Sequence, residues 1–344
     1  MKASKELWLG IKSIMIISKT PFRISFFGGG TDYPVWFKEH GGQVLSTTID
    51  KYCYLSVRYF PPFFPYKHRI VYSKIETVND TNEILHPAVK AALEFFKIDK
   101  GLSIHHDGDL PARTGLGSSS AFTVGLLHAL HGLQGQNVIK EELAREAIHL
   151  ERDVLKENVG SQDQVAVTYG GLNKLVFSGA NDVSVQPVAV SEARRKELES
   201  HIVLYFTGFS RYASEVAKEQ IEKTPQKQKE LQEMSDMVNE GIRILQDEQI
   251  NISEFGKLLG ESWQLKKSLT DKISTREIDA LYERAVRAGA VGGKLLGAGG
   301  GGFMLLFIPP EKQESVRGEL KDFLEVKCKF ENGGSQIIYH NSHV

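Results

Sequence analysis

The chain has 344 residues, of which 41% are hydrophobic, so it can bury a substantial core, and its length favours two domains. Its 42 basic and 43 acidic residues leave a net charge of −1, which argues against nucleic acid or an anionic membrane as a partner. The two cysteines, Cys53 and Cys328, belong to no zinc or disulfide pattern. No apolar run approaches the roughly 18 residues that a membrane span needs.

The first 13 residues are expected to form an extension of unknown role. The first plausible strand begins near Ile14, and Met15 offers an alternative translation start. Lys12 interrupts the apolar character of the segment and no small-residue cleavage site follows, so we expect no signal peptide. Together with the sparse cysteines, this favours the reducing cytoplasm.

The stretch from residue 14 to about residue 190 combines short strands with two helices. Its strand segments are rich in β-branched and aromatic residues, and three glycines at 28–30 end one of them. Apolar residues recur every three or four positions in the second helix. In chain order, we expect strands at 14–17, 22–27, 44–48, 52–59 and 102–106, helices at 119–131 and 140–155, and a strand at 172–177.

Polar and charged residues dominate positions 180–200, where we expect the domain boundary. The two domains would then be residues 14–190 and 191–344. The second combines terminal strands with central helices, a pattern that predicts an α+β domain rather than repeated βαβ units. Its elements are a strand at 201–206, helices at 213–223, 226–247, 252–269 and 275–288, a strand at 303–308, a helix at 313–324 and a strand at 336–339.

The segment 111–121 (PARTGLGSSSA) lies between a predicted strand and a predicted helix. Glycines allow the backbone to approach a bulky anion, and the helix N-terminus presents free N–H groups and hydroxyls to it. The alternative is an ordinary glycine-rich turn with a serine cap. A Walker A loop is excluded because Leu295 follows Lys294, and a dinucleotide fingerprint because Ser120 replaces its last glycine.

This segment resembles the phosphate loop of the galactokinase, homoserine kinase, mevalonate kinase and phosphomevalonate kinase (GHMP) superfamily, whose pattern is Pro-x3-Gly-Leu-Gly-Ser-Ser-x-Ala. Two further stretches resemble the family's other motifs in the same order: PFRISFFGGGTD at 21–32 and KLLGAGGGGF at 294–303. The resemblance implies an α+β fold of two domains. The N-terminal domain would have a left-handed βαβ crossover and the C-terminal domain would be ferredoxin-like.

The resemblance also implies a kinase that uses ATP and Mg²⁺. Glu151 and Ser119 would hold the metal, Asp163 would accept the proton of the acceptor hydroxyl or orient it, and Arg23 would neutralise charge near the reaction centre. These are the hard oxygen ligands and positioned charges that phosphoryl transfer requires. Without the resemblance, Glu151 would be a solvated helix residue and Asp163 a loop cap. The residues matched to the ATP phosphates are Gly115, Leu116, Gly117, Ser118, Ser119 and Ser120.

The acceptor is expected to be a sugar, because Asp32 can accept hydrogen bonds from sugar hydroxyls. Several stretches resemble heptose phosphate kinases and the related fucose kinases, among them TGFSRYAS at 207–214. The former phosphorylate the anomeric hydroxyl of D-glycero-D-manno-heptose 7-phosphate on the way to GDP-heptose for surface polysaccharides. The expected substrate contacts are Asp32, Gly29, Gly30, Thr31, Arg211, Gly299 and Gly300.

A substrate that already carries phosphate needs cations at its far end, and Arg211 is our choice because it follows a strand in a glycine- and serine-containing loop. Other candidates are Lys51, Arg58, Lys67, His68, Arg69, Arg113 and Lys174. Two alternatives stay open: a kinase for an unphosphorylated sugar such as fucose or galactose, and a non-catalytic sugar sensor on the same fold. The sequence does not indicate an oligomeric state.

Overall fold

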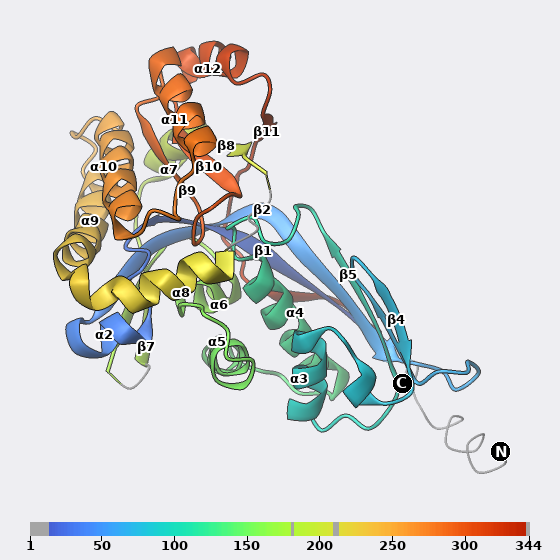
Figure 1. Cartoon of the computed structure of the whole chain (residues 1–344). Helices are drawn as coiled ribbons and strands as arrows, with labels where there is room; N and C mark the ends of the chain where they lie inside the picture. The colour runs from blue at the N-terminus through green and yellow to red at the C-terminus, as the bar shows by residue number, and fades with distance from the viewer. Residues whose placement is uncertain (1–13, 180–181, 209–212, 342–344) are drawn as a thin grey trace.

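The computed structural model describes residues 14–179, 182–208 and 213–341. Figure 1 shows a long twisted sheet with helices packed on it and, above one end, a smaller sheet with its own helices. The described chain is therefore α+β in two parts, as expected from the sequence.

The large sheet is built on two long antiparallel strands, β1 (Met15–Phe27) and β2 (Gly42–Tyr59). Each covers two of the strands predicted separately, because the strand register shifts at Pro21 instead of the strand ending there. The main order is β13-β1-β2-β5-β3-β4, and β12, β6 and β7 pair beside this path. The remaining bounds are β3 (His68–Val71), β4 (Ile75–Val78), β5 (Leu102–Gly108), β6 (Asn173–Ser178), β7 (Asp182–Pro187), β12 (Phe330–Glu331) and β13 (Gln336–Asn341).

Helix α4 (Ser118–Leu133) packs on β1 and β2, and most of its side chains are buried. It is the predicted buried helix that follows the glycine-rich loop, and it begins one residue earlier than expected. Packed against it are α3 (Pro87–Phe95), α5 (Lys140–Ile148), η2 (His149–Val154) and α6 (Gln162–Tyr169), while η1 (Thr81–Glu83) lies beside α3 and α2 (Pro34–His40) beside β6. The predicted helix 140–155 is thus α5 followed by η2, a π-helical turn.

The small sheet has the antiparallel order β11-β8-β10-β9. In chain order its strands and helices run β8, helices, β9, β10, α12 and β11, which is the ferredoxin-like arrangement. Its strands are β8 (Ile202–Phe206), β9 (Gly292–Leu295), β10 (Phe303–Phe307) and β11 (Leu324–Val326). The helices are α7 (Glu192–His201), α8 (Ala213–Lys223), η3 (Thr224–Gln226), α9 (Gln228–Gln246), α10 (Ser253–Leu269), α11 (Arg276–Ala288), η4 (Pro310–Lys312) and α12 (Gln313–Glu319).

The end of the chain returns to the large sheet. β13 pairs with β1 and β12 pairs with β2, so the residues after the small sheet complete the N-terminal part. The polar stretch is not a bare linker, because its described residues, 182–200, contain all of β7 and all but the last residue of α7. A domain boundary near residue 190 stays a prediction. Cutting the chain once at that point would separate β12 and β13 from the large sheet in which they pair.

Candidate active site

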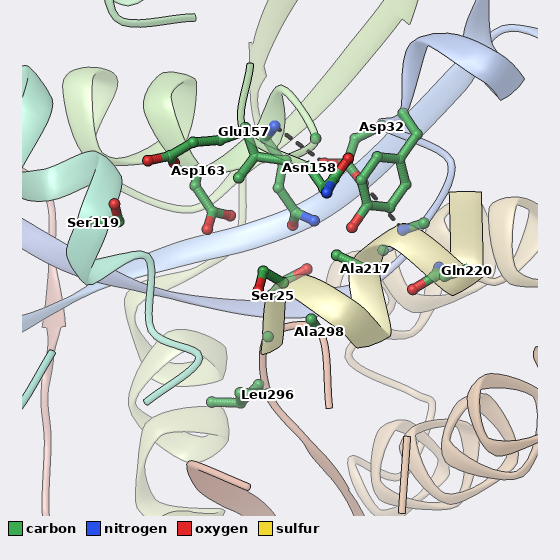
Figure 2. Close-up of a pocket in the computed structure, with 18 of the residues that line it drawn as sticks. Ser25, Asp32, Ser119, Glu157, Asn158, Asp163, Ala217, Gln220, Leu296 and Ala298 are labelled. Atoms are coloured by element: carbon green, nitrogen blue, oxygen red, sulfur yellow. Dashed lines mark hydrogen bonds between the residues drawn. The ribbon is translucent and has the colours of Figure 1, made fainter. Parts of the chain in front are cut away.

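A cavity of about 550 Å³ lies between the large sheet, the loop after η2, and helices and loops of the C-terminal part (Figure 2). Asp32, Asp163 and Ser119 approach it from the N-terminal part, and Ala217, Gln220 and Ala298 from the C-terminal part. Charged side chains line it unevenly. The cations are Arg23, Arg113, Lys156, Lys266 and Lys294, and the carboxylates are Asp32, Glu157 and Asp163. This excess of cations suits an anionic ligand.

Arg23, on β1, fixes one oxygen of Asp163. Its Nε lies 2.8 Å and its Nη2 2.6 Å from Asp163 Oδ1, while its Nη1 donates to the carbonyl of Gly115 at 2.7 Å. Arg23 is almost fully buried, whereas Asp163, in the first turn of α6, is partly open to the cavity. The guanidinium therefore joins the carboxylate to the glycine-rich loop and leaves Asp163 Oδ2 available to a ligand.

Asp32 is buried in the wall of the cavity beside the start of α6, and its carboxylate is held by backbone amides. The N–H of Gly30 donates to Oδ1 at 3.0 Å and the N–H of Gln162 donates to Oδ2 at 3.2 Å. Burial and the nearby charge of Asp163 raise the pKa of Asp32, and these hydrogen bonds lower it. A Cβ on Gly160 would lie 1.8 Å from Asp32 Oδ2, so this position requires a glycine.

The glycine-rich loop is held in place by tight backbone packing. Gly115 and Gly117 have positive φ of 80° and 72°, and a Cβ on Gly115 would lie 2.4 Å from the Leu296 carbonyl oxygen. Gly117 directly precedes the N-terminus of α4. Of the six loop residues expected at the ATP phosphates, only Ser119 has its side chain at the cavity. Leu116 is buried, and Ser118 Oγ accepts from the N–H of Arg113.

Glu151 lies in η2 and is fully buried beside α4. Its Oε2 accepts a hydrogen bond from Ser120 Oγ at 2.8 Å and another from Gln164 Nε2, while Oε1 has no hydrogen-bond partner among the described residues. Burial raises the pKa of Glu151 to about 7, although the nearby Thr123 hydroxyl and the hydrogen bonds from Ser120 and Gln164 act to lower it. The expected partner of Glu151 was Ser119, but Ser120 is the serine that contacts it.

Three predicted substrate residues, Asp32, Gly29 and Gly30, line the cavity, and three others do not. Thr31 is fully buried, and its hydroxyl donates to the carbonyl oxygens of Gly28 and Gln43. Gly299 and Gly300 are not among the lining residues, and the N–H of Gly300 donates to the Ile273 carbonyl. From the glycine-rich segment 294–303, the residues Leu296, Gly297 and Ala298 line the cavity instead. Arg211 lies outside the described residues.

Sequence reasoning missed Lys266 and Glu157, and it quoted Lys294 only as part of a motif. A signal for Lys266 exists: Phe255, Leu259 and Trp263 mark the buried stripe of α10, and Lys266 continues it. A lysine on an apolar stripe predicts a buried cation with a specific partner. No comparable signal exists for Glu157, whose N–H donates to the Glu151 carbonyl and whose loop is tied to Asp32 by the N–H of Ser161.

Matches to known proteins cover both parts of the chain. Residues 83–171 match the profile of the GHMP kinases N terminal domain and residues 244–326 that of the GHMP kinases C terminal. The chain is 31% identical to a D-glycero-alpha-D-manno-heptose 7-phosphate kinase of Campylobacter jejuni subsp. jejuni serotype O:2 over 330 residues, 90% of this chain and 96% of that protein.

Solved structures agree on the fold. A D-glycero-D-manno-heptose 1-phosphate kinase from Bacteroides thetaiotaomicron superposes with a TM-score of 0.74 at 24% identity, covering 94% of this chain and 99% of that one. Lactococcus lactis galactokinase in complex with galactose gives a TM-score of 0.73 at 19% identity, with 94% and 95% coverage.

The structure combines a ferredoxin-like sheet with a large mixed sheet, and a glycine-rich loop lies at the N-terminus of the buried helix α4. This combination defines a small-molecule kinase fold. The chain belongs to the GHMP kinase family and is a phosphotransferase. Across the described ranges, no helix combines the length and apolar character needed to cross a membrane.

Proposed function

We propose that this protein transfers the γ-phosphoryl group of ATP to the anomeric hydroxyl of D-glycero-D-manno-heptose 7-phosphate, giving the 1,7-bisphosphate for GDP-heptose synthesis in the cytoplasm. The observation that carries the proposal is the arrangement of Arg23, Asp163 and Ser119 around one cation-rich cavity. The likeness to the Campylobacter jejuni heptose 7-phosphate kinase supports this acceptor.

The nucleotide phosphates would lie over the N-terminus of α4, where the loop 115–119 presents backbone N–H groups and the helix dipole favours negative charge. Ser119 is the exposed hydroxyl of the loop and faces the cavity. Its role would be to contact the phosphates or the metal that accompanies them. The other loop residues would act through their backbone, because their side chains are buried or already hydrogen-bonded.

The residues present fit a Mg²⁺ ion. Glu151 Oε1 is a buried carboxylate oxygen without a partner among the described residues, and Ser120 and Gln164 fix the orientation of the carboxylate through Oε2. Glu151 Oε1 and Ser119 Oγ would be the ligands, both of the hard oxygen type that Mg²⁺ prefers. When bound, the ion would neutralise negative charge on the β- and γ-phosphates.

Asp163 would receive the proton of the acceptor hydroxyl, or orient that hydroxyl, through Oδ2. Arg23 occupies Oδ1 and so fixes the direction in which Oδ2 points. Asp32 would accept hydrogen bonds from sugar hydroxyls, in a position fixed by the amides of Gly30 and Gln162. The acceptor would therefore contact both aspartates, which line the same cavity (Figure 2).

A kinase for an unphosphorylated sugar is the second candidate, favoured by the shared fold with Lactococcus lactis galactokinase. ADP formation measured with a panel of free sugars and sugar 7-phosphates separates the two candidates. Turnover with heptose 7-phosphate at least about tenfold faster than with any free sugar supports the proposal. Turnover with fucose or galactose and none with heptose 7-phosphate contradicts it, and no turnover with any acceptor favours the sensor alternative.

A further inference from the structure

Two lysines of the C-terminal part lie buried at the cavity with no carboxylate partner in the described chain. Lys266, on α10, is 7% exposed, and Lys294, on β9, is 3% exposed. Lys266 Nζ donates to the carbonyls of Leu295 at 2.8 Å and Gly297 at 2.6 Å, and Lys294 Nζ donates to that of Phe26 at 2.8 Å.

These bonds do not use all the donors of the two side chains. An ammonium group has three N–H bonds, so one remains on Lys266 and two on Lys294. Buried cations without a counter-charge are costly, and both lysines lie close enough to Arg23 for its charge to lower their pKa values. A bound anion would satisfy the remaining donors and offset the repulsion.

The lysines lie next to the glycine-rich loop rather than at the far end of the cavity. Lys266 binds the carbonyl of Gly297, and a Cβ on Gly297 would lie 2.4 Å from the Cα of Gly115 in that loop. Lys294 binds the carbonyl of Phe26, three residues along β1 from Arg23. An anion bound by both would therefore lie between the loop and Asp163.

We propose that Lys266 and Lys294, together with Arg23, bind the phosphoryl group during its transfer from nucleotide to acceptor. This rests on the proposed kinase function and deepens it. The bond from the γ-phosphorus to the bridging oxygen breaks, its electron pair leaves on ADP, and the acceptor oxygen forms the new bond. The acceptor proton goes to Asp163 or to solvent, and the lysines contact the equatorial oxygens, where charge is concentrated.

Comparing the binding of a nucleoside diphosphate with that of a triphosphate isolates the contact made by the γ-phosphoryl group. We would titrate Lys266→Met and Lys294→Met with Mg-ADP and with the slowly hydrolysed analogue ATPγS by calorimetry, beside Lys257→Met on the exposed side of α10. Each cavity variant should weaken ATPγS binding by about 10- to 100-fold, the range for a charged hydrogen bond. ADP binding should stay within about twofold, and Lys257→Met should leave both unchanged.

Three results would overturn the proposal. Equal losses for ADP and ATPγS would mean that the lysines only hold the loop 295–297 in place. Unchanged binding of both would mean that they contact no ligand. A loss confined to the KM of a phosphorylated acceptor, compared with its unphosphorylated analogue, would assign the lysines to the phosphate that the sugar already carries. The first two results come from nucleotide binding alone and do not depend on which acceptor the enzyme prefers, so a failure there is distinct from a failure of the proposed function.

Proton uptake by the unaltered protein provides a second test if a variant does not fold. Burial lowers the pKa of Lys294 to about 7 and that of Lys266 well below its usual value, and an anion beside them would raise both. The other charged groups facing this cavity are Arg23, Arg113, Lys156, Asp32, Glu157 and Asp163. Calorimetry at pH 8 in two buffers of different ionisation enthalpy should detect proton uptake with ATPγS beyond that with ADP. Equal uptake with both would contradict the proposal.

Discussion

Replacing Gly160 by alanine should damage acceptor binding while sparing nucleotide binding. The new Cβ would lie 1.8 Å from Asp32 Oδ2, and real Cβ contacts essentially never fall below 3.0 Å, so the two must separate by at least 1.2 Å. That shift breaks the 3.2 Å hydrogen bond from the N–H of Gln162 to Asp32 Oδ2. A hydrogen bond to a charged group contributes about 1.5–3 kcal/mol, so kcat/KM for the sugar should fall about 10- to 100-fold.

The assay is steady-state turnover with the sugar varied, beside calorimetric titration with Mg-ADP. The ADP dissociation constant should change less than about twofold, because Gly160 lies on the wall that holds Asp32 and not on the glycine-rich loop. Gly318→Ala is the matched control, since its Cβ would meet nothing within 4 Å. Unchanged acceptor kinetics in Gly160→Ala, or equal losses for acceptor and ADP, would refute this account of Asp32.

Two further predictions concern the carboxylates. Asp163→Ala should lower kcat by at least about 10²-fold with ADP binding retained, and full turnover would remove Asp163 from the chemistry. Because burial raises the pKa of Glu151 from 4.5 to about 7, the metal-free folded chain holds a proton that the unfolded chain releases between these pH values. Its unfolding free energy should therefore fall as pH rises through this window, by up to about 3 kcal/mol, and Glu151→Gln should abolish that share of the fall. Urea unfolding in EDTA at pH 4.5 and pH 8 measures it, and equal falls in both proteins would contradict the prediction.

Local patterns predicted most helices and strands because their causes are local. The apolar run after the glycine-rich loop forms α4. In the second half of the chain, segments with one polar and one apolar face form α8 to α11. The errors came from contacts between distant residues. The strands predicted at 14–17 and 22–27 are one strand, β1, because its pairing with β2 continues past Pro21 with a register shift. Nothing near residues 330–341 indicates that they pair with β1 and β2.

The sequence predicted those site residues that belong to a recognisable motif. Arg23, Asp32, Ser119 and Asp163 all reach the cavity, as expected from their motifs. The π-helical turn η2 was not predictable from the helical pattern of 140–155, although it directs Glu151 towards Ser120. Thr31 was wrongly predicted to contact the ligand because of its position in the motif. Its hydroxyl instead hydrogen-bonds to backbone carbonyls.

Phosphorus NMR of the reaction mixture tests the central claim most directly. Incubation of the protein with Mg-ATP and D-glycero-D-manno-heptose 7-phosphate should produce ADP and, in equal amount, a new phosphate resonance coupled to the anomeric proton. The resonance of the phosphate on carbon 7 should persist. ADP accompanied only by inorganic phosphate, or a phosphorylated product without coupling to the anomeric proton, would contradict the assignment of this cavity to anomeric phosphoryl transfer.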